Sequence, residues 1–461
     1  MKKQTPRSLA IEILNRVENG QAFAEPLLDQ YLATDLLSDI RDRGLLTELV
    51  YGTLRMRGFL DWVLAQFLQK DLTAADTGLR NILRTALYQI FFTDKIPDHA
   101  IVNEAVELTK LADPGKVSLT NAILRNVLRR KEQLPFPERR QDFRSYMAIL
   151  HSHPTWMVDR WVRQWGEEEA LSLCQANNTV APLVLRANRL QTSRKRVIEE
   201  LHREGITVEK TAYAPDGLVV REAGKSLRDT VAYRQGLFQV QDEASQMIAR
   251  LVNPVAGETI LDLCAGMGGK ATYLAEIMAN RGRIIAVDLR KGKLRQLQDL
   301  AKRLTVRIIE PVAADATADL DKVDHNSCDR VLVDVPCSGL GTLRRCPEIK
   351  WRLTPEILQS NTRLQKTLLD RAGNYVKPGG RLIYSTCSIM PEENEEVVEA
   401  FIATHPEFLL VFPTGVERLF LDDRGYFRTF PHRHGTDGFF GAVMEKTTRG
   451  EKGYDPIDRQ D

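Results

Sequence analysis

The chain has 461 residues, 43% of them hydrophobic and 27% charged, which is an ordinary globular composition with room for two or three domains. A formal net charge of +2 excludes a polycation and confines any nucleic-acid surface to a local patch. Six cysteines form no Cys-x-x-Cys pair, which disfavours a zinc ribbon or a disulfide framework and favours reduced thiols. No uncharged run approaches the length of a membrane span, so we expect a cytoplasmic protein.

The N-terminal part of the chain has apolar residues at steps of three and four, the period of helices packed around a core. The pattern predicts helices over 8–17, 44–60, 79–92, 100–111 and 119–128. We therefore expect a helical bundle over residues 1–135. Its basic end, 125–131, complements a helix C-terminus as readily as it would contact RNA, and both readings stay open.

Two further regions follow. Residues 145–235 show a mixed pattern, with helices predicted over 157–174 and 193–204 and strands over 183–188 and 217–220, which indicates a small α/β linking module. Residues 236–446 alternate strands and helices, and the strands are predicted over 259–263, 283–288, 306–309, 329–334 and 381–386. Such alternation predicts a Rossmann-like parallel sheet that binds ligands beyond the carboxyl ends of its strands. Residues 447–461 are interpreted as a polar tail.

A glycine-rich turn after the first of these strands contains Cys264, Ala265, Gly266, Met267, Gly268, Gly269 and Lys270. It is not a P-loop, which would need glycine at 264 and Ser or Thr at 271. The glycines allow close backbone approach, Asp288 after the second strand can accept from both hydroxyls of a ribose, and Asp315 can accept from an adenine amine. This pattern predicts an S-adenosylmethionine pocket that needs no metal; a purely structural turn with incidental acids is the alternative.

Two cysteines follow strand-like runs fifty residues apart, Cys337 in Asp-Val-Pro-Cys-Ser-Gly and Cys387 in Tyr-Ser-Thr-Cys-Ser. Free cysteine is usually a small buried hydrophobic residue, and we keep that interpretation for the other four. C5 of cytosine is barely nucleophilic, but a thiolate that adds to C6 makes it reactive, and a carboxyl group at N3 stabilises the developing charge. Asp334 and the two cysteines supply these groups. The sequence thus predicts covalent cytosine-5 methylation, without deciding which cysteine attacks.

Several motifs together resemble a known family. Residues 236–446 are similar to the NOL1/NOP2/Sun RNA cytosine-5 methyltransferases, and residues 1–130 resemble the NusB-like RNA-binding bundle. The motifs that carry the resemblance are 239–245, 262–270, 334–339, 384–388, the Thr-Asp-Gly-Phe-Phe run 436–440, and 43–54 and 102–108 in the bundle. The whole resembles the RsmB (Fmu/Sun) group of small-subunit (16S) rRNA methyltransferases, and no motif departs at a position that carries chemistry.

The resemblance implies roles that the residues alone left open. It implies that Cys387 is the nucleophile and that Cys337 assists release of the methylated product. It also implies donor contacts from 264–270, Asp288, Asp315 and Asp334. The implied partner is small-subunit ribosomal RNA; we expect no membrane, no obligate protein partner and a monomer.

Positive charge is dense near these motifs and could neutralise phosphates around a flipped-out cytosine, although single charges are usually solvated surface. The residues are Arg344, Arg345, Lys350 and Arg352 after Cys337, and Arg424, Arg428, His432, Arg433 and His434 before the Thr-Asp-Gly run. Three other functions remain as alternatives. These are a tRNA cytosine-5 methyltransferase, an RNA-binding assembly or antitermination factor with a vestigial methyltransferase fold, and an amide-nitrogen methyltransferase, which would want Pro-Pro-Tyr/Phe where this chain has Val-Pro-Cys.

Overall fold

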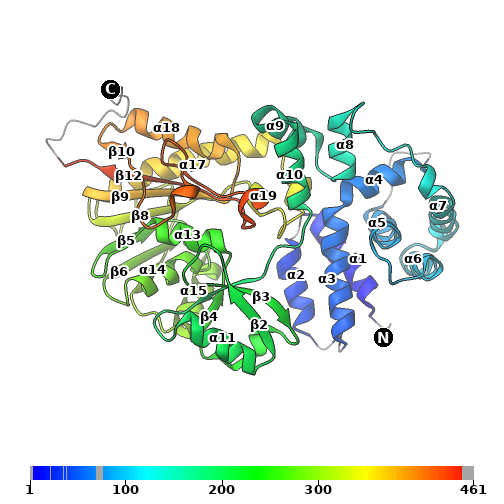
Figure 1. The fold of residues 1–461 in the computed structure, drawn as a ribbon, viewed down its shortest axis with the longest axis horizontal. Coiled ribbons are helices and arrows are strands. Elements are labelled where there is room, and N and C mark those ends of the chain that lie inside the picture. The colour runs from blue at the N-terminus through cyan, green and yellow to red at the C-terminus, as the bar shows by residue number, and fades with distance from the viewer. Residues whose placement is uncertain (1–3, 21, 35, 38, 69–75, 449–461) are drawn as a thin grey trace. The chain divides into compact units, whose positions relative to one another are not determined.

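The computed structural model describes residues 4–448 except 21, 35, 38 and 69–75, so most of the expected tail 447–461 lies outside the described residues. The chain divides into two compact units, coloured along the sequence in Figure 1. Unit 1 comprises Met1–Val180 and Leu343–Arg352, and unit 2 comprises Ala181–Thr342 and Leu353–Asp461. Among the described helices, none combines the length and the apolar character needed to cross a membrane.

Unit 1 is helical, and it contains residues 136–180 in addition to the region 1–135 expected to form a bundle. Its main helices are α1 (Pro6–Glu18), α2 (Ala24–Leu32), α3 (Ile40–Arg55), α4 (Arg57–Ala65), α5 (Thr77–Phe92), α6 (Asp98–Ala112), α7 (Val117–Arg130), α8 (Phe143–Leu150), α9 (Thr155–Trp165) and α10 (Glu167–Asn177). Leucine, isoleucine and valine side chains from α1 to α7 meet in one core, because each helix turns its apolar face inward.

Two predicted helices are each divided in the structure. The stretch 44–60 breaks at Met56, where the backbone leaves helical geometry between α3 and α4. The stretch 157–174 breaks at Gly166, whose φ of 83° is left-handed and therefore interrupts a right-handed helix. Apolar periodicity alone missed both breaks because it continues across them, and it also missed the short helix α2.

A ten-residue segment, 343–352, belongs to unit 1 although its neighbours in sequence belong to unit 2. It contains the short helix α16 (Ile349–Arg352). Lys350 is buried, and its Nζ donates to the carbonyl oxygens of Arg55 and Ser152, both at 2.8 Å, and to Oδ1 of Asn178 at 3.2 Å. Because Arg55 ends α3 and Asn178 caps α10, this cation closes helix C-termini, where positive charge is stabilising.

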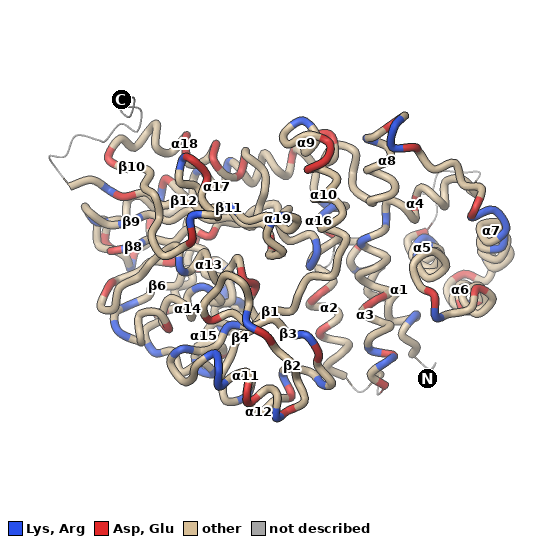
Figure 2. The backbone as a smooth tube through the Cα atoms, viewed as in Figure 1, with Lys and Arg blue, Asp and Glu red and all other residues tan. Residues whose placement is uncertain are grey.

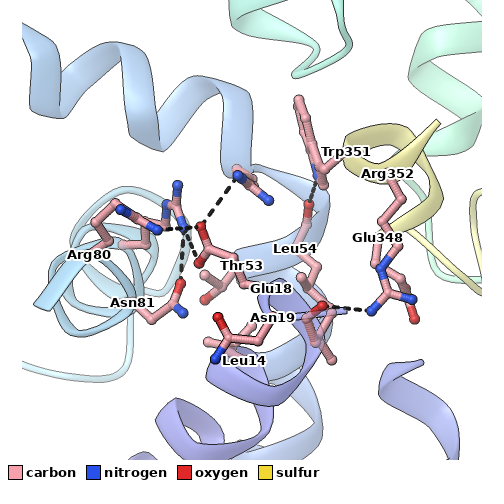
Figure 3. A pocket seen from close by; sticks show the side chains of 13 residues that line it. Leu14, Glu18, Asn19, Thr53, Leu54, Arg80, Asn81, Glu348, Trp351 and Arg352 are labelled. Atoms are coloured by element: carbon pink, nitrogen blue, oxygen red, sulfur yellow. Dashed lines mark hydrogen bonds and ion pairs between the residues drawn. The ribbon is translucent and has the colours of Figure 1, made fainter. Parts of the chain in front are cut away.

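Other side chains of the same segment contact further helix ends (Figure 3). Trp351 Nε1 donates to Leu54 O at 2.7 Å, Arg352 donates to Val17 O at 2.6 Å and to Ala22 O, and Glu348 Oε1 accepts from Ala24 N at 2.7 Å. The acid thus lies at the first residue of α2, and Arg352 lies at a carbonyl in the last turn of α1, which matches the helix dipoles. Segment 343–352 is therefore an integral part of the helical unit.

Unit 2 begins with a small antiparallel sheet in the order β2-β3-β1-β4. Its strands are β1 (Val184–Ala187), β2 (Ile206–Lys210), β3 (Gly217–Ala223) and β4 (Phe238–Val240), with helices α11 (Arg194–Arg203) and α12 (Val231–Arg234). The apolar residues of these strands and helices form a separate small core.

The second sheet of unit 2 has the order β10-β12-β9-β8-β5-β6-β7, with β11 paired to β12. The strands are β5 (Thr259–Asp262), β6 (Arg283–Asp288), β7 (Ile309–Ala313), β8 (Cys328–Asp334), β9 (Val376–Thr386), β10 (Phe408–Leu410), β11 (Phe427–Arg428) and β12 (Phe440–Lys446). Strands β7, β6, β5, β8 and β9 are parallel, and β12 runs antiparallel to β9. The predicted strand 306–309 lies earlier than β7, whose pairing with β6 begins at Ile309.

Helices cover both faces of this sheet. Helices α13 (Glu243–Leu251) and α14 (Gly269–Ile277) contribute to one apolar core, and α17 (Pro355–Tyr375) and α18 (Glu395–Thr404) contribute to the other. Helix α15 (Lys291–Arg303) connects β6 to β7, and α19 (Pro431–His434) precedes β12. The expected fold class, an α bundle followed by α/β domains with a Rossmann-like sheet, is confirmed.

Candidate active site

The carboxyl ends of the parallel strands bring the predicted site residues together. Asp262, Asp288 and Asp334 are the last residues of β5, β6 and β8, and Asp315 follows β7 by two residues. A cavity of about 660 Å³ opens at this edge. Of the residues predicted to bind a cofactor, it is lined by Cys264, Ala265, Gly266, Met267, Gly269, Lys270, Asp288, Asp315 and Asp334.

The glycine turn has two left-handed residues with different surroundings. Gly266 has φ 58°, and a Cβ there would meet nothing closer than 4.0 Å, so its backbone is open to the cavity. Gly268, the N-cap of α14, has φ 83°, and a Cβ there would lie 2.5 Å from Leu297 on α15. Gly268 is therefore explained by helix packing, and among the predicted turn residues it is the one that does not line the cavity.

Two of the predicted carboxylates are held by backbone amides. Asp288 accepts from the N–H of Gly266 at 3.0 Å and of Arg290 at 2.8 Å, which ties the glycine turn to the end of β6. Asp315 accepts from the N–H and the hydroxyl of Thr317 at 2.9 and 2.7 Å, and these hydrogen bonds lower the pKa of Asp315. Both carboxylates are thus fixed in position at the rim of the cavity.

Asp262 is a cavity residue that the sequence analysis did not single out. Its side chain is 1% exposed, and neither carboxylate oxygen makes a hydrogen bond of normal geometry. Burial, and next the charge of Asp334, raise the pKa of Asp262 to about 7. An acid at the end of a buried strand, directly before a glycine turn, was the available signal.

Asp334 lies between a cation and a hydroxyl. Lys270 Nζ is 2.6 Å from one of its oxygens, and Ser385 Oγ donates to the other at 2.7 Å. Burial opposes the charge on Lys270, but the charge and hydrogen bond of Asp334, followed by the charge of Cys387, raise its pKa. The Lys270 ammonium also lies 5.2 Å from the ring of Phe439, in the Thr-Asp-Gly-Phe-Phe motif.

The two predicted catalytic thiols are neighbours. Cys337 Sγ and Cys387 Sγ lie 3.2 Å apart, at the ends of adjacent strands β8 and β9. The hydrogen bond with Cys387, together with burial, raises the pKa of Cys337 well above its usual value. Neither thiol lines the cavity. Asp334 and Pro336, which precede Cys337 in sequence, do line it. Cys174 and Cys328 are buried, as expected for structural cysteines.

The basic residues after Cys337 are not the surface that the sequence suggested. Arg344 is 5% exposed and Lys350 is 1% exposed, and Lys350 and Arg352 bond to helix ends within unit 1. The expectation that this group faces RNA phosphates is therefore wrong for Arg344 and Lys350.

In the second basic group, before the Thr-Asp-Gly run, two arginines pair with acidic side chains. Arg424 pairs with Glu399 at 2.5 Å, and Arg428 pairs with Glu395 at 3.0 Å and Asp422 at 3.1 Å. Figure 2 shows acidic residues interspersed with basic ones along both units.

Comparisons with known proteins match three parts of the chain to family models. The family described as "16S rRNA methyltransferase RsmB/F" matches residues 249–445, the NusB family matches 4–129, and an RsmF/B-like ferredoxin-like domain matches 153–226. The chain is 37% identical over 456 residues to a probable ribosomal RNA small subunit methyltransferase B of Bacillus subtilis (strain 168), covering 97% of this chain and 100% of that one.

Two further similarities support the same assignment. The ribosomal RNA small subunit methyltransferase B of Pseudomonas putida is 34% identical over 449 residues, covering 96% of this chain and 98% of that one. A solved methyltransferase homolog protein from Pyrococcus horikoshii aligns with TM-score 0.57 and 28% identity over 65% of this chain and 97% of that chain. The chain belongs to the RsmB/F family of 16S rRNA methyltransferases.

Proposed function

We propose that the protein methylates C5 of one cytosine in small-subunit ribosomal RNA, in the cytoplasm, with S-adenosylmethionine as donor and a covalent bond between Cys387 and C6 as intermediate. The observation that carries this proposal is the contact of two free thiols, 3.2 Å apart, beside the Asp334–Lys270 pair. We further propose an RNA-binding bundle (1–135), a linking module (145–235) and a catalytic domain (236–446), of which residues 145–180 and 343–352 pack with the helical unit. The names of the relatives support the rRNA substrate.

The residues of the cavity fit the proposed donor. A volume of about 660 Å³ is within the usual range of roughly 300–1,000 Å³ for small-molecule sites. We propose that Asp288 accepts from the ribose hydroxyls, Asp315 from the adenine amine, and the unpaired carboxyl group of Asp262 from the amino group of the methionine part. When bound, the donor supplies a methyl group on a sulfonium sulfur. The turn 264–270 would hold it through its backbone.

The proposed reaction begins at Cys387. After its thiol has lost a proton to solvent, the sulfur adds to C6, and the C5=C6 electron pair becomes available at C5, where the methyl group is accepted. Negative charge develops at N3; we propose that Asp334 in its carboxylic acid form donates a proton to N3 and recovers it when C5=C6 is restored, while the Lys270 ammonium beside Asp334 adds positive charge. The C5 proton then passes to water, the C5–H electron pair restores C5=C6, and the S–C6 bond breaks with its electrons returning to Cys387.

Cys337 has its proposed part in the last step. As a neutral thiol 3.2 Å from Cys387, it can donate a hydrogen bond to the sulfur that leaves C6. The hydrogen bond with Cys387 and burial raise the pKa of Cys337. The raised pKa favours the neutral form of this thiol. Cys337 therefore aids elimination but is not needed for attack.

Two variants test the proposal in one experiment. Labelled RNA is incubated with donor and with Cys387→Ala or Cys337→Ala, and adducts are resolved by denaturing electrophoresis. We expect no adduct and no methylation with Cys387→Ala. With Cys337→Ala we expect a methylated RNA that stays attached to the protein. An adduct that persists in Cys387→Ala but is absent in Cys337→Ala would reverse the two roles.

The alternative functions make different predictions. A vestigial methyltransferase fold would show no rise in melting temperature with S-adenosylmethionine, whereas an active donor site is stabilised by binding. Bisulfite sequencing of rRNA and tRNA from a deletion strain distinguishes the two RNA substrates, because only the true target loses its methylated cytosine.

A further inference from the structure

A buried carboxylate that the proposed reaction does not use lies behind the two cysteines. Glu393 is completely buried in the short helix Pro391–Glu393 that follows the Cys387 loop. Its Oε1 accepts from the backbone N–H of Ser338 at 2.8 Å and from Gln365 Nε2 at 3.0 Å, and its Oε2 accepts from Ser338 Oγ at 2.5 Å. Asn361 Nδ2 adds a longer contact of 3.4 Å. Glu393 is thus bound mainly to the residue next to Cys337.

The hydroxyl of Ser338 joins the two cysteine loops. Ser338 Oγ lies 3.1 Å from Ser388 Oγ, and Ser388 Oγ accepts from the backbone N–H of Met390 at 3.2 Å. Since Ser338 donates its only hydroxyl proton to Glu393, the proton between the two serines comes from Ser388. The resulting chain runs from Ser388 through Ser338 to Glu393, so the carboxylate sets the direction of every hydrogen bond in it.

Further bonds fix the other side of this arrangement. Asn394 Nδ2 donates to Ser388 O at 3.1 Å, and Thr386 Oγ1 donates to Asn394 Oδ1 at 2.6 Å. Asn394, the residue after Glu393, therefore holds Thr386 and Ser388, which flank Cys387. A buried carboxylate with several hydrogen-bond donors is costly to disturb, and this makes it a rigid reference point.

The charges around the two thiols are unequal. Glu393 contributes, after the Cys387 hydrogen bond, burial and the Cys387 charge, to the raised pKa of Cys337. On the other side, the Lys270 ammonium interacts with the charge of Cys387. The negative group behind Cys337 favours a proton on that thiol.

We propose that Glu393 is a positioning residue for product release: its carboxylate clamps Ser338 so that Cys337 stays beside Cys387 as the hydrogen-bond donor of the pair. This inference rests on the proposed function, because it assumes that Cys387 forms the adduct and Cys337 helps to resolve it. It assigns to the Pro-Glu-Glu segment a task distinct from methyl transfer.

The test measures the ratio of protein-bound to free methylated RNA in Glu393→Ala. Release should slow by about tenfold, less than the roughly 10²–10⁴-fold effect of a group that itself transfers the proton, because Glu393 acts through Ser338, while the KM for RNA stays within roughly twofold of wild type. Adduct should accumulate. A parallel fall of adduct and free product, or an unchanged ratio, would overturn the proposal, since a merely structural role predicts no accumulation.

Two further variants keep the test decisive if Glu393→Ala folds poorly. Ser338→Ala removes the bridging hydroxyl and little volume, and it should accumulate adduct in the same way. Glu393→Gln keeps an acceptor for the Ser338 N–H and should restore release at least in part; an amide that restores nothing, in a protein of normal melting temperature, contradicts the clamp. Glu396→Gln, at an exposed position on α18, is the matched control and should behave as wild type.

The same gel separates the two proposals. If Cys387→Ala still forms an adduct, the proposed roles of the cysteines fail, whatever Glu393 does. If Cys337→Ala accumulates adduct but neither Glu393→Ala nor Ser338→Ala does, the cysteine roles stand and the clamp alone is rejected.

Discussion

Two regions of this molecule each hold a buried ionisable side chain, and the two side chains differ in how completely their polar atoms are hydrogen-bonded. At the strand ends of unit 2, Asp262 is buried without a hydrogen bond of normal geometry beside an open cavity. In segment 343–352 of unit 1, burial lowers the pKa of Lys350 to about 7, but its Nζ has three acceptors, one for each N–H of the ammonium form. A buried charge with every partner in place stabilises a fold, whereas one without partners beside a cavity indicates a ligand.

Loss of the Lys350 cation should have the largest effect on stability. Lys350→Met leaves two backbone carbonyls and an amide oxygen unpaired at helix ends, so we expect the free energy of unfolding of unit 1 to fall by roughly 3–5 kcal/mol. Thermal melting measures this, with Lys366→Met at an exposed site on α17 as control. An unchanged melting temperature of Lys350→Met would contradict a role of this residue in stability. Weaker donor binding by a variant that melts normally would show that Lys350 serves ligand binding instead.

Asp288→Ala should weaken donor binding and leave RNA binding nearly intact. Each charge-assisted hydrogen bond that is lost costs roughly 1.5–3 kcal/mol, which corresponds to more than a tenfold rise in Kd for the donor. Calorimetry gives the donor Kd directly. Since Asp288 also accepts from Gly266 in the turn, an unchanged Kd would remove both the carboxylate and the turn from the donor site.

Asp262 predicts a dependence of stability on pH. Its pKa is raised to about 7 in the folded protein, so the folded state binds a proton more tightly than the unfolded state. Stability from this group is therefore complete at acidic pH and is lost as the pH rises toward and through 7. Asp262→Asn should remove that loss, so its melting temperature relative to wild type should increase between pH 5 and 8. A constant difference across this range would contradict the assignment.

The smallest expected effect concerns the arginines after Cys337. Because Arg344 is buried in unit 1, Arg344→Gln should leave unchanged the slope of log RNA affinity against log salt concentration, whereas loss of a phosphate contact would flatten it by about one. Filter binding at several salt concentrations gives the slope. A flatter slope would show that the segment faces RNA after all.

The sequence predicted which residues meet at the carboxyl ends of the parallel strands because its evidence is local. Strands end at Asp288, Asp334 and Thr386, and parallel strands necessarily bring such ends to one edge, so each motif could be placed from its own neighbourhood. Asp262 escaped because an acid inside a strand pattern looks like part of the strand. The separation of the two thiols and the hydrogen bonds of Glu393 depend on side-chain packing, which no spacing rule provides.

Segment 343–352 could not be placed from sequence for a different reason. Its charges read as a solvated basic surface, because composition does not distinguish a cation in water from one at a helix end. Its partners lie far away along the chain; Lys350 and Arg55 are 295 positions apart. Only the folded structure shows that the density of positive charge near Cys337 serves the bundle.

The inserted segment also sets an order on synthesis and folding. The bundle precedes the second unit in the chain and leaves the ribosome before it, yet the side chains that close α1, α2 and α3 are made some 300 residues later. Until then these helix ends lack the side chains that later bond to them. The bundle therefore reaches its final stability after most of the catalytic domain has been translated, and such distant contacts form slowly. A fragment cut after residue 180 would resemble this nascent intermediate more closely than the finished unit.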